Sequence, residues 1–146
     1  MEYIRNKKAT FEYSLEETIE AGIELLGTEV KSVKANHGSL SGAYVAFVGG
    51  DALLLGAHIP AWQEKNVPVT YDPYRTRKLL LHKKEMLKLS QVLQNKGLTI
   101  VPISLYNNKG KVKLSIAVAK GKKLFDKRNT LKERAMKRDS ERDLSN

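Results

Sequence analysis

The chain has 146 residues, with 26 Lys or Arg side chains against 16 Asp or Glu, and a formal net charge of +10. This length is typical of one domain. The lack of cysteine excludes disulfides and cysteine-based metal sites. No apolar stretch of the sequence is long enough to cross a bilayer. So strong a positive charge attracts polyanions, and the commonest polyanion in a cytoplasm is nucleic acid.

Residues 9–26 alternate apolar and polar side chains with a period of two, which predicts an unusually long strand. Its polar face carries four glutamates: Glu12, Glu16, Glu20 and Glu24. A strand of this length must bend or divide, and we expect the bulge at Gly22.

The next segments predict a short helix and a hairpin. Thr28 can cap the helix and Gly38 can end it. Strands at about 43–48 and 52–59 then flank Gly49-Gly50, a pair of residues typical of a tight turn. The segment that follows, residues 60–77, contains three prolines and is expected to be a loop.

Residues 78–97 change to helical spacing. The apolar stripe of this helix consists of Leu81, Met86, Leu89, Val92 and Leu93, and Gly97 is a suitable end. Two further strands follow, at 98–106 and 111–119, joined by a turn at 107–110. The second strand places Val112, Leu114, Ile116 and Val118 on one side.

These elements predict a mainly β (α+β) domain over residues 1–121, with roughly six strands and two or three flanking helices. Consecutive strands form hairpins instead of repeated strand–helix units. This order favours a closed antiparallel barrel resembling the oligonucleotide-binding (OB) fold over a doubly wound parallel sheet.

Residues 122–146 form a basic tail of different composition, with nine Lys or Arg, five Asp or Glu and few large apolar side chains. Burial of so few side chains cannot compensate for the lost chain entropy, so we expect the free tail to be unfolded. Thr130 and Glu133 have the spacing of a capping box, which favours a helix once a phosphate-rich partner surrounds it. The alternative is a tail that only adds charge and solubility.

The sequence offers little for catalysis or metal binding. His37, His58 and His82 lie on three different predicted elements, whereas zinc ligands usually include a close pair. Neither a nucleophile elbow nor a phosphate-binding loop is present. The glutamate row leaves a hydrolase open as an alternative, and it equally suits acceptors for base amino groups or ribose hydroxyls. We therefore predict no catalytic residue, metal or cofactor.

Several stretches, taken together and in order, closely resemble the small protein B family, the SsrA-binding proteins of bacterial trans-translation. The resemblance is carried by "NKKATFEY", "EAGIELLGTEVKSVKA", "AYVAF", "GAHI", "RTRKLLLHKKE", "LTIVPISLY" and "KGKK" followed by Phe125-Asp126-Lys127-Arg128. No single stretch is decisive, but the ordered combination spans nearly the whole chain.

The resemblance implies an OB-like barrel that binds the tRNA-like domain of transfer-messenger RNA (tmRNA) and delivers it to stalled ribosomes. It places RNA contacts at Asn6, Glu20 and Leu80, and makes Lys7 and Lys8 phosphate contacts. It further implies a protein that is not an enzyme; with the lack of a signal-peptide core, we expect a soluble, cytoplasmic monomer.

For the tail, the resemblance implies contacts with the small-subunit decoding centre and the empty mRNA channel of the ribosome. The expected contact residues are Lys122, Lys123, Phe125, Asp126, Lys127, Arg128, Lys132, Arg134, Lys137 and Arg138. Many family members have His where this chain has Phe125, which keeps stacking but loses a hydrogen bond. The remaining alternative function is a ribosomal or general structural RNA-binding protein of OB-like fold.

Overall fold

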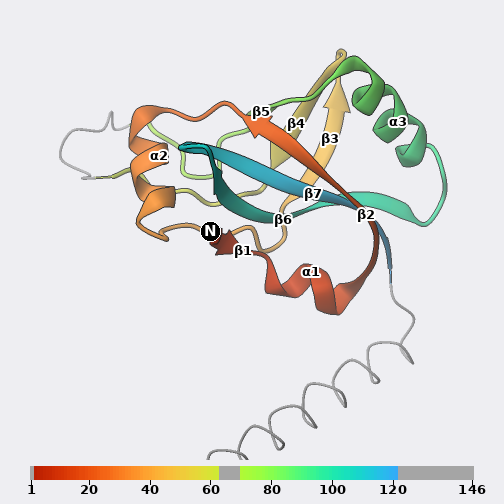
Figure 1. Cartoon of the computed structure of the whole chain (residues 1–146), viewed down its shortest axis with the longest axis horizontal. Helices are drawn as coiled ribbons and strands as arrows, with labels where there is room; N and C mark the ends of the chain where they lie inside the picture. Colours follow the sequence, from red (N-terminus) through yellow and green to blue (C-terminus); the bar gives the residue numbers. More distant parts are fainter. Residues whose placement is uncertain (1, 63–69, 122–146) are drawn as a thin grey trace, which may run out of the picture.

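A computed structural model describes residues 2–62 and 70–121 of the chain (Figure 1). The strands within them are β1 Glu2–Arg5, β2 Tyr13–Ile23, β3 Tyr44–Val48, β4 Asp51–Leu55, β5 Arg77–Leu80, β6 Leu98–Asn108 and β7 Lys111–Gly121. The helices are α1 Lys7–Glu12, α2 Gly27–Lys34 and α3 Lys83–Leu93. None of these three helices has the length and apolar character needed to span a membrane.

All strand pairs are antiparallel, and the strands form one sheet in the order β1-β6-β7-β2-β5-β4-β3. The sheet curls around a core of fully buried side chains from several strands, among them Leu54, Leu105, Leu114 and Ile116. Helix α3 supplies Leu89 to this core. The opposite face of β6 and β7 is covered by α1, whose Ala9 packs with Val101 and Ala119.

The prediction of a closed barrel was wrong, because the end strands β1 and β3 do not pair with each other within the described residues. Closure would require β3 to pair with the outer edge of β6. Part of that edge is occupied by β1, and the Asn6 side chain bonds the carbonyl of Pro102 next to it. Proline also lacks the N–H that a further strand would need there. The mainly β architecture with three helices was correct.

The first predicted strand was wrong at its start, because residues 7–12 form α1. Asn6 initiates this helix by accepting the backbone N–H of Ala9 at 3.2 Å. The alternation from Tyr13 onward is a true strand, β2. Its bulge lies between Leu15 and Glu17 and not at Gly22, so the one extra residue changes the pairing with β7 early in the strand.

The short helix forms as α2, with different ends from those predicted. Its N-cap is Leu26, whose backbone N–H donates to the Glu29 carboxylate at 2.8 Å, whereas Thr28 bonds the backbone of Trp62. The helix ends at Lys34, and Asn36 adopts the left-handed conformation with φ 63°. The predicted stop at Gly38 was therefore too late.

Both predicted hairpins are confirmed. Gly49 and Gly50 have φ values of 59° and 84° in the turn between β3 and β4. Positive φ at both central residues is the conformation that a two-residue hairpin turn requires. Lys109 and Gly110 play the same part between β6 and β7, where Asn108 pairs with Lys111.

The count of roughly six strands was too low, since seven strands lie in the described residues, whereas the three helices agree with the expected two or three. Besides α1, β1 was missed, and β5 was assigned to the loop and the following helix. Its sequence, RKLL, alternates buried and exposed positions for only four residues. The predicted division at Gly121 and all expectations for residues 122–146 lie outside the described residues.

Candidate nucleic-acid interface

One row of cross-strand partners runs over four strands on the outer face of the sheet. Tyr106 on β6 pairs with Lys113 on β7, Lys113 pairs with Gly22 on β2, and Gly22 pairs with Leu80 on β5. Their neighbours along the strands, Ala21 and Leu79, point the other way and are buried in the core. The row therefore presents a phenol, an ammonium and an isobutyl group on one surface.

Leu80 is 51% exposed, although Leu79 directly before it is buried. Gly22 accounts for its position, because a Cβ added to Gly22 would lie only 3.0 Å from the Leu80 Cβ. The missing side chain lets Leu80 lie across β2. Glycine in a strand interior often marks such a close approach, and here it presents an apolar side chain to solvent.

Glu20 lies two residues before Gly22 on the same face of β2. The Asn108 amide donates to both of its carboxylate oxygens, at 3.0 and 3.2 Å, and the Tyr106 hydroxyl donates to the same carboxylate. Lys113 lies close enough to act on its charge. Glu20 is therefore an exposed carboxylate held by donors from a neighbouring strand.

These contacts change the titration of both groups. The hydrogen bonds from Tyr106 and Asn108, with the charge of Lys113, lower the pKa of Glu20 below its ordinary value. Partial burial and the adjacent carboxylate raise the pKa of Tyr106 above its ordinary value. At neutral pH the carboxylate is thus charged and the phenol remains a donor.

Glu20 and Leu80 line the same groove, which has a volume of about 620 Å³. The other lining residues are Thr18, Ile19, Gly22, Leu81, His82, Glu85 and Lys113. A second groove of about 370 Å³ shares Gly22, Leu80 and Lys113 with it and continues to Lys111 and Val30. The second groove reaches both Lys111 and Val30 because the β6–β7 turn lies beside α2 (Figure 1). Together the two grooves offer cations, the carboxylates of Glu20 and Glu85, and an apolar floor.

The other predicted RNA contacts lie elsewhere. Asn6 is only 5% exposed, and its amide donates to the Pro102 carbonyl at 2.8 Å while it caps α1. It lines a separate pocket of about 250 Å³, together with Lys8. Lys7 and Lys8 are exposed on α1. The fold thus brings Glu20 and Leu80 together and leaves Asn6, Lys7 and Lys8 as a second group beside α1.

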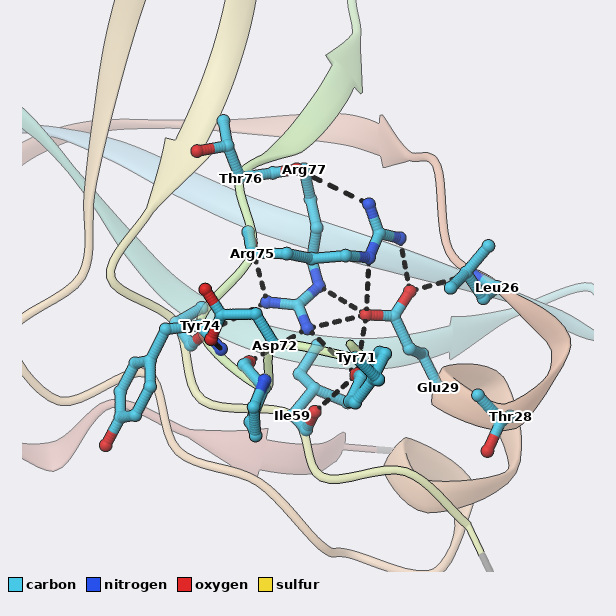
Figure 2. Close-up of polar contacts among 12 residues, drawn as sticks. Leu26, Thr28, Glu29, Ile59, Tyr71, Asp72, Tyr74, Arg75, Thr76 and Arg77 are labelled. Carbon is cyan, nitrogen blue, oxygen red and sulfur yellow. Dashed lines mark hydrogen bonds and ion pairs between the residues drawn. The ribbon is translucent and has the colours of Figure 1, made fainter. Parts of the chain in front are cut away.

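A buried polar cluster lies on the inner side of the segment that leads into β5 (Figure 2). The Glu29 carboxylate of α2 accepts from Arg75 and Arg77, and the Tyr71 hydroxyl donates to it at 3.0 Å. Glu29 and Arg77 are both 0% exposed. Arg77 also donates to the Ala57 carbonyl at 2.9 Å, so the cluster fixes the chain three residues before Leu80.

Burial alone would raise the pKa of Glu29, but the hydrogen bonds from Arg75, Leu26 and Arg77 outweigh it and hold the pKa below the ordinary value. The same burial, with the Glu29 carboxylate, raises the pKa of Tyr71. At neutral pH the Glu29 carboxylate is thus charged, and the Tyr71 phenol remains a neutral donor. Since the carboxylate at its centre and the Arg77 side chain are fully buried, the cluster's role is to fix the fold.

Sequence reasoning missed Tyr106, Asn108 and Lys113 as site residues. The alternation of side chains along the last two predicted strands could have identified them in part, because it places Tyr106 and Asn108 on the face opposite the buried Leu105. Register between strands distant in the sequence could not be read from the chain, so their approach to Glu20 was not predictable.

The glutamate row does not persist in the fold. Glu12 ends α1, Glu16 lies at the bulge and Glu24 follows the end of β2, so of the four only Glu20 lies in a regular part of the strand. The histidines remain apart: His37 lies against Trp62, His58 against Tyr74, and His82 at the start of α3. In residues 2–62 and 70–121 no group of three His, Asp or Glu side chains has the arrangement of a metal site.

Comparison with known proteins gives consistent matches. The family model described as SmpB protein matches residues 3–146. An SsrA-binding protein of Clostridium kluyveri is 47% identical over 139 residues, covering 95% of this chain and 88% of the relative. One of Prochlorococcus marinus strain AS9601 is 48% identical over 134 residues, covering 92% and 82%. A solved structure described as "tmRNA-SmpB: a journey to the center of the bacterial ribosome" matches with a TM-score of 0.68 and 41% identity, covering 82% of this chain and 84% of that one.

Proposed function

This chain belongs to the SmpB protein family, and on that basis we propose that it binds the tRNA-like domain of tmRNA and delivers it to stalled ribosomes for trans-translation. The related proteins are named for SsrA binding, and the related structure joins tmRNA, SmpB and the ribosome in its description. The proposed partners are therefore tmRNA and the ribosome, in the cytoplasm.

The observation that carries the proposal is the groove between Glu20, Leu80 and Lys113. Leu80 offers an apolar surface to an unstacked base or a ribose, Lys113 offers charge to a phosphate, and Glu20 offers an acceptor to a base amine or a hydroxyl. Proteins recognise single-stranded RNA loops with this combination of groups. The curled sheet serves here as the binding platform that an OB-like barrel would supply.

The proposed role is binding without catalysis. The lowered pKa of Glu20 makes it a poor general acid, because it stays ionised well below neutral pH. Its partners are an amide and a phenol, both of which act as hydrogen-bond donors to the carboxylate. A hydrogen-bond acceptor for RNA uses this state, whereas a hydrolase acid does not.

Two further parts of the proposal concern residues outside this groove. Asn6, Lys7 and Lys8 form a second RNA contact beside α1, in which the exposed lysines meet phosphate and Asn6 chiefly shapes the backbone. The tail, 122–146, contacts the decoding centre and the mRNA channel through its basic residues and Phe125, and thereby forms a second functional unit.

The experiment compares Leu80→Ala with Leu87→Ala in binding to the isolated tRNA-like RNA and to an unrelated hairpin at one salt concentration. Leu87 is 63% exposed on α3 and lies outside the groove. We expect Leu80→Ala to weaken binding of the tRNA-like RNA about tenfold, as loss of most of one buried aliphatic side chain would. Leu87→Ala should leave it unchanged.

The alternative, a general structural RNA-binding protein, predicts a different result. The wild-type protein would then bind both RNAs with similar affinity, and the two leucine variants would behave alike. That outcome would contradict the proposed function.

A further inference from the structure

We propose that Tyr106 and Asn108 are positioning residues that hold the Glu20 carboxylate in one orientation, so that it accepts one hydrogen-bond donor of the bound RNA. The donor is a ribose 2′-hydroxyl or a base amine. This inference rests on the proposed function, because it assigns the ligand chemistry of the same groove.

The contacts of Glu20 show how it is held. Asn108 donates to both carboxylate oxygens, and Tyr106 donates to the same group. An exposed glutamate normally samples several rotamers, and a ligand must restrict them at an entropic cost. Here two side chains of β6 have already restricted them, so the carboxylate is preorganised before RNA binds.

Tyr106 and Asn108 are well suited to this role. They lie two residues apart on β6 and therefore on the same face, and both are only partly exposed. Asn108 directly precedes the tight turn at Lys109 and Gly110, which fixes the end of the strand. Glu20 lines the groove, whereas Tyr106 and Asn108 lie behind it and do not. They would therefore act on RNA through Glu20.

The chemistry of the carboxylate defines its ligand. A carboxylate offers about four acceptor positions and no donor. Tyr106 and Asn108 use some of these positions, and the rest are free for a donor on the groove side. A phosphate is excluded as the partner of Glu20, because both groups are anions; Lys113 and Lys111 supply the cations for phosphate. The lowered pKa of Glu20 agrees with an acceptor that stays charged.

A double-mutant cycle tests the inference with the full chain and the tRNA-like RNA. Tyr106→Phe removes only the hydroxyl, and we expect it to weaken binding about tenfold, the scale of one hydrogen bond to a charged group. In a Glu20→Gln background the same change should cost less than about twofold, because the carboxylate it positions is gone. Asn108→Ala should show the same pattern, and Tyr74→Phe, which alters an exposed tyrosine outside the groove, should have no effect.

Equal penalties for Tyr106→Phe in both backgrounds would show a structural role only and would overturn the inference. If instead the wild-type protein shows no preference for the tRNA-like RNA, the proposed function fails. The positioning of Glu20 is then still decided by a measurement on the free protein. Carboxyl carbon NMR should show the pKa of Glu20 moving up towards its ordinary value in Tyr106→Phe and in Asn108→Ala, and an unchanged titration would refute the positioning role.

The identity of the donor is tested by analogue interference. RNA pools carrying random 2′-deoxy substitutions, or analogues of guanosine, adenosine and cytidine that lack the exocyclic amine (inosine for guanosine), are selected for binding to the wild-type protein and to Glu20→Gln. We expect one position whose substitution interferes with the wild type but not with Glu20→Gln. Interference by the 2′-deoxy analogue identifies a ribose hydroxyl, and interference by inosine identifies the amine of guanine. A map without any such position would contradict the assigned ligand.

Discussion

Two carboxylates of this protein, Glu29 and Glu20, are each held by several donors, and both have a lowered pKa. Glu29 is 0% exposed and bonds two arginines and a tyrosine, which join α2 to the segment before β5. Glu20 lies at the surface and bonds an amide and a phenol of β6. The chemistry is similar, but the accessibility is opposite.

The difference separates a structural site from the proposed binding site. A buried carboxylate has no acceptor accessible to a ligand, and it requires full compensation because an unpaired charge in the interior is very unfavourable. An exposed carboxylate is solvated in any case, so fixing it contributes little to folding. Its preorganisation gains importance only when a ligand arrives. Donors around Glu29 therefore stabilise the fold, whereas donors around Glu20 have the role in recognition that we propose.

The comparison predicts its largest effect at Arg77. Arg77→Met leaves the Glu29 carboxylate without a fully buried partner, and we expect the free energy of unfolding to fall by about 3–5 kcal/mol. Urea denaturation followed by circular dichroism measures this change. A loss below about 1 kcal/mol, the level of a surface pair, would show that the cluster does not stabilise the fold.

A second variant controls for the change of shape at residue 77. Arg77→Met combined with Glu29→Gln removes both buried charges while retaining a side chain that can bond the Leu26 N–H. Because the double variant no longer holds a buried carboxylate that has lost one of its two arginines, it should be more stable than Arg77→Met alone. If it is less stable, the loss reflects packing of the arginine stem instead of charge.

The two carboxylates also show what the sequence could and could not reveal. Glu20 was recognisable as a site residue from the polar parity of its strand and from the family resemblance. Glu29 was not, because its partners Arg75 and Arg77 lie more than forty positions away, at 46 and 48 residues. Local patterns predict hairpins such as β3–β4 and β6–β7, in which turn residues dictate the pairing.

Non-local pairing accounts for the errors. Helix α1 was hidden by an alternation that continues into β2, and only the bonds from Asn6 to Ala9 and Pro102 decide against a strand there. The four residues of β5 pair with β2 and β4, distant segments that no local period identifies. The open sheet has the same origin, since Asn6 and β1 occupy the β6 edge that closure would need.

The acid dependence of stability provides the second prediction. The folded pKa of Glu29 lies below its ordinary value of 4.5, so its contribution to stability is complete above that pH. The contribution is lost as the pH falls through the folded pKa, when the carboxylate takes up a proton. Melting temperatures of the wild type should therefore fall below about pH 4.5, more steeply than those of Arg77→Met/Glu29→Gln. Parallel curves for the two proteins would mean that Glu29 titrates normally.

The smallest effect is expected at the ion pair between Lys88 of α3 and Glu17 of β2. This pair joins two elements, as the Glu29 cluster does, but its side chains are 52% and 45% exposed. Water and salt screen such a pair, so Lys88→Ala should change the free energy of unfolding by less than about 1 kcal/mol. Urea denaturation at low and at high salt measures it, and the difference between wild type and variant should shrink as salt rises. A loss as large as that of Arg77→Met would show that linkage between elements, and not burial, determines what an ion pair contributes to this fold.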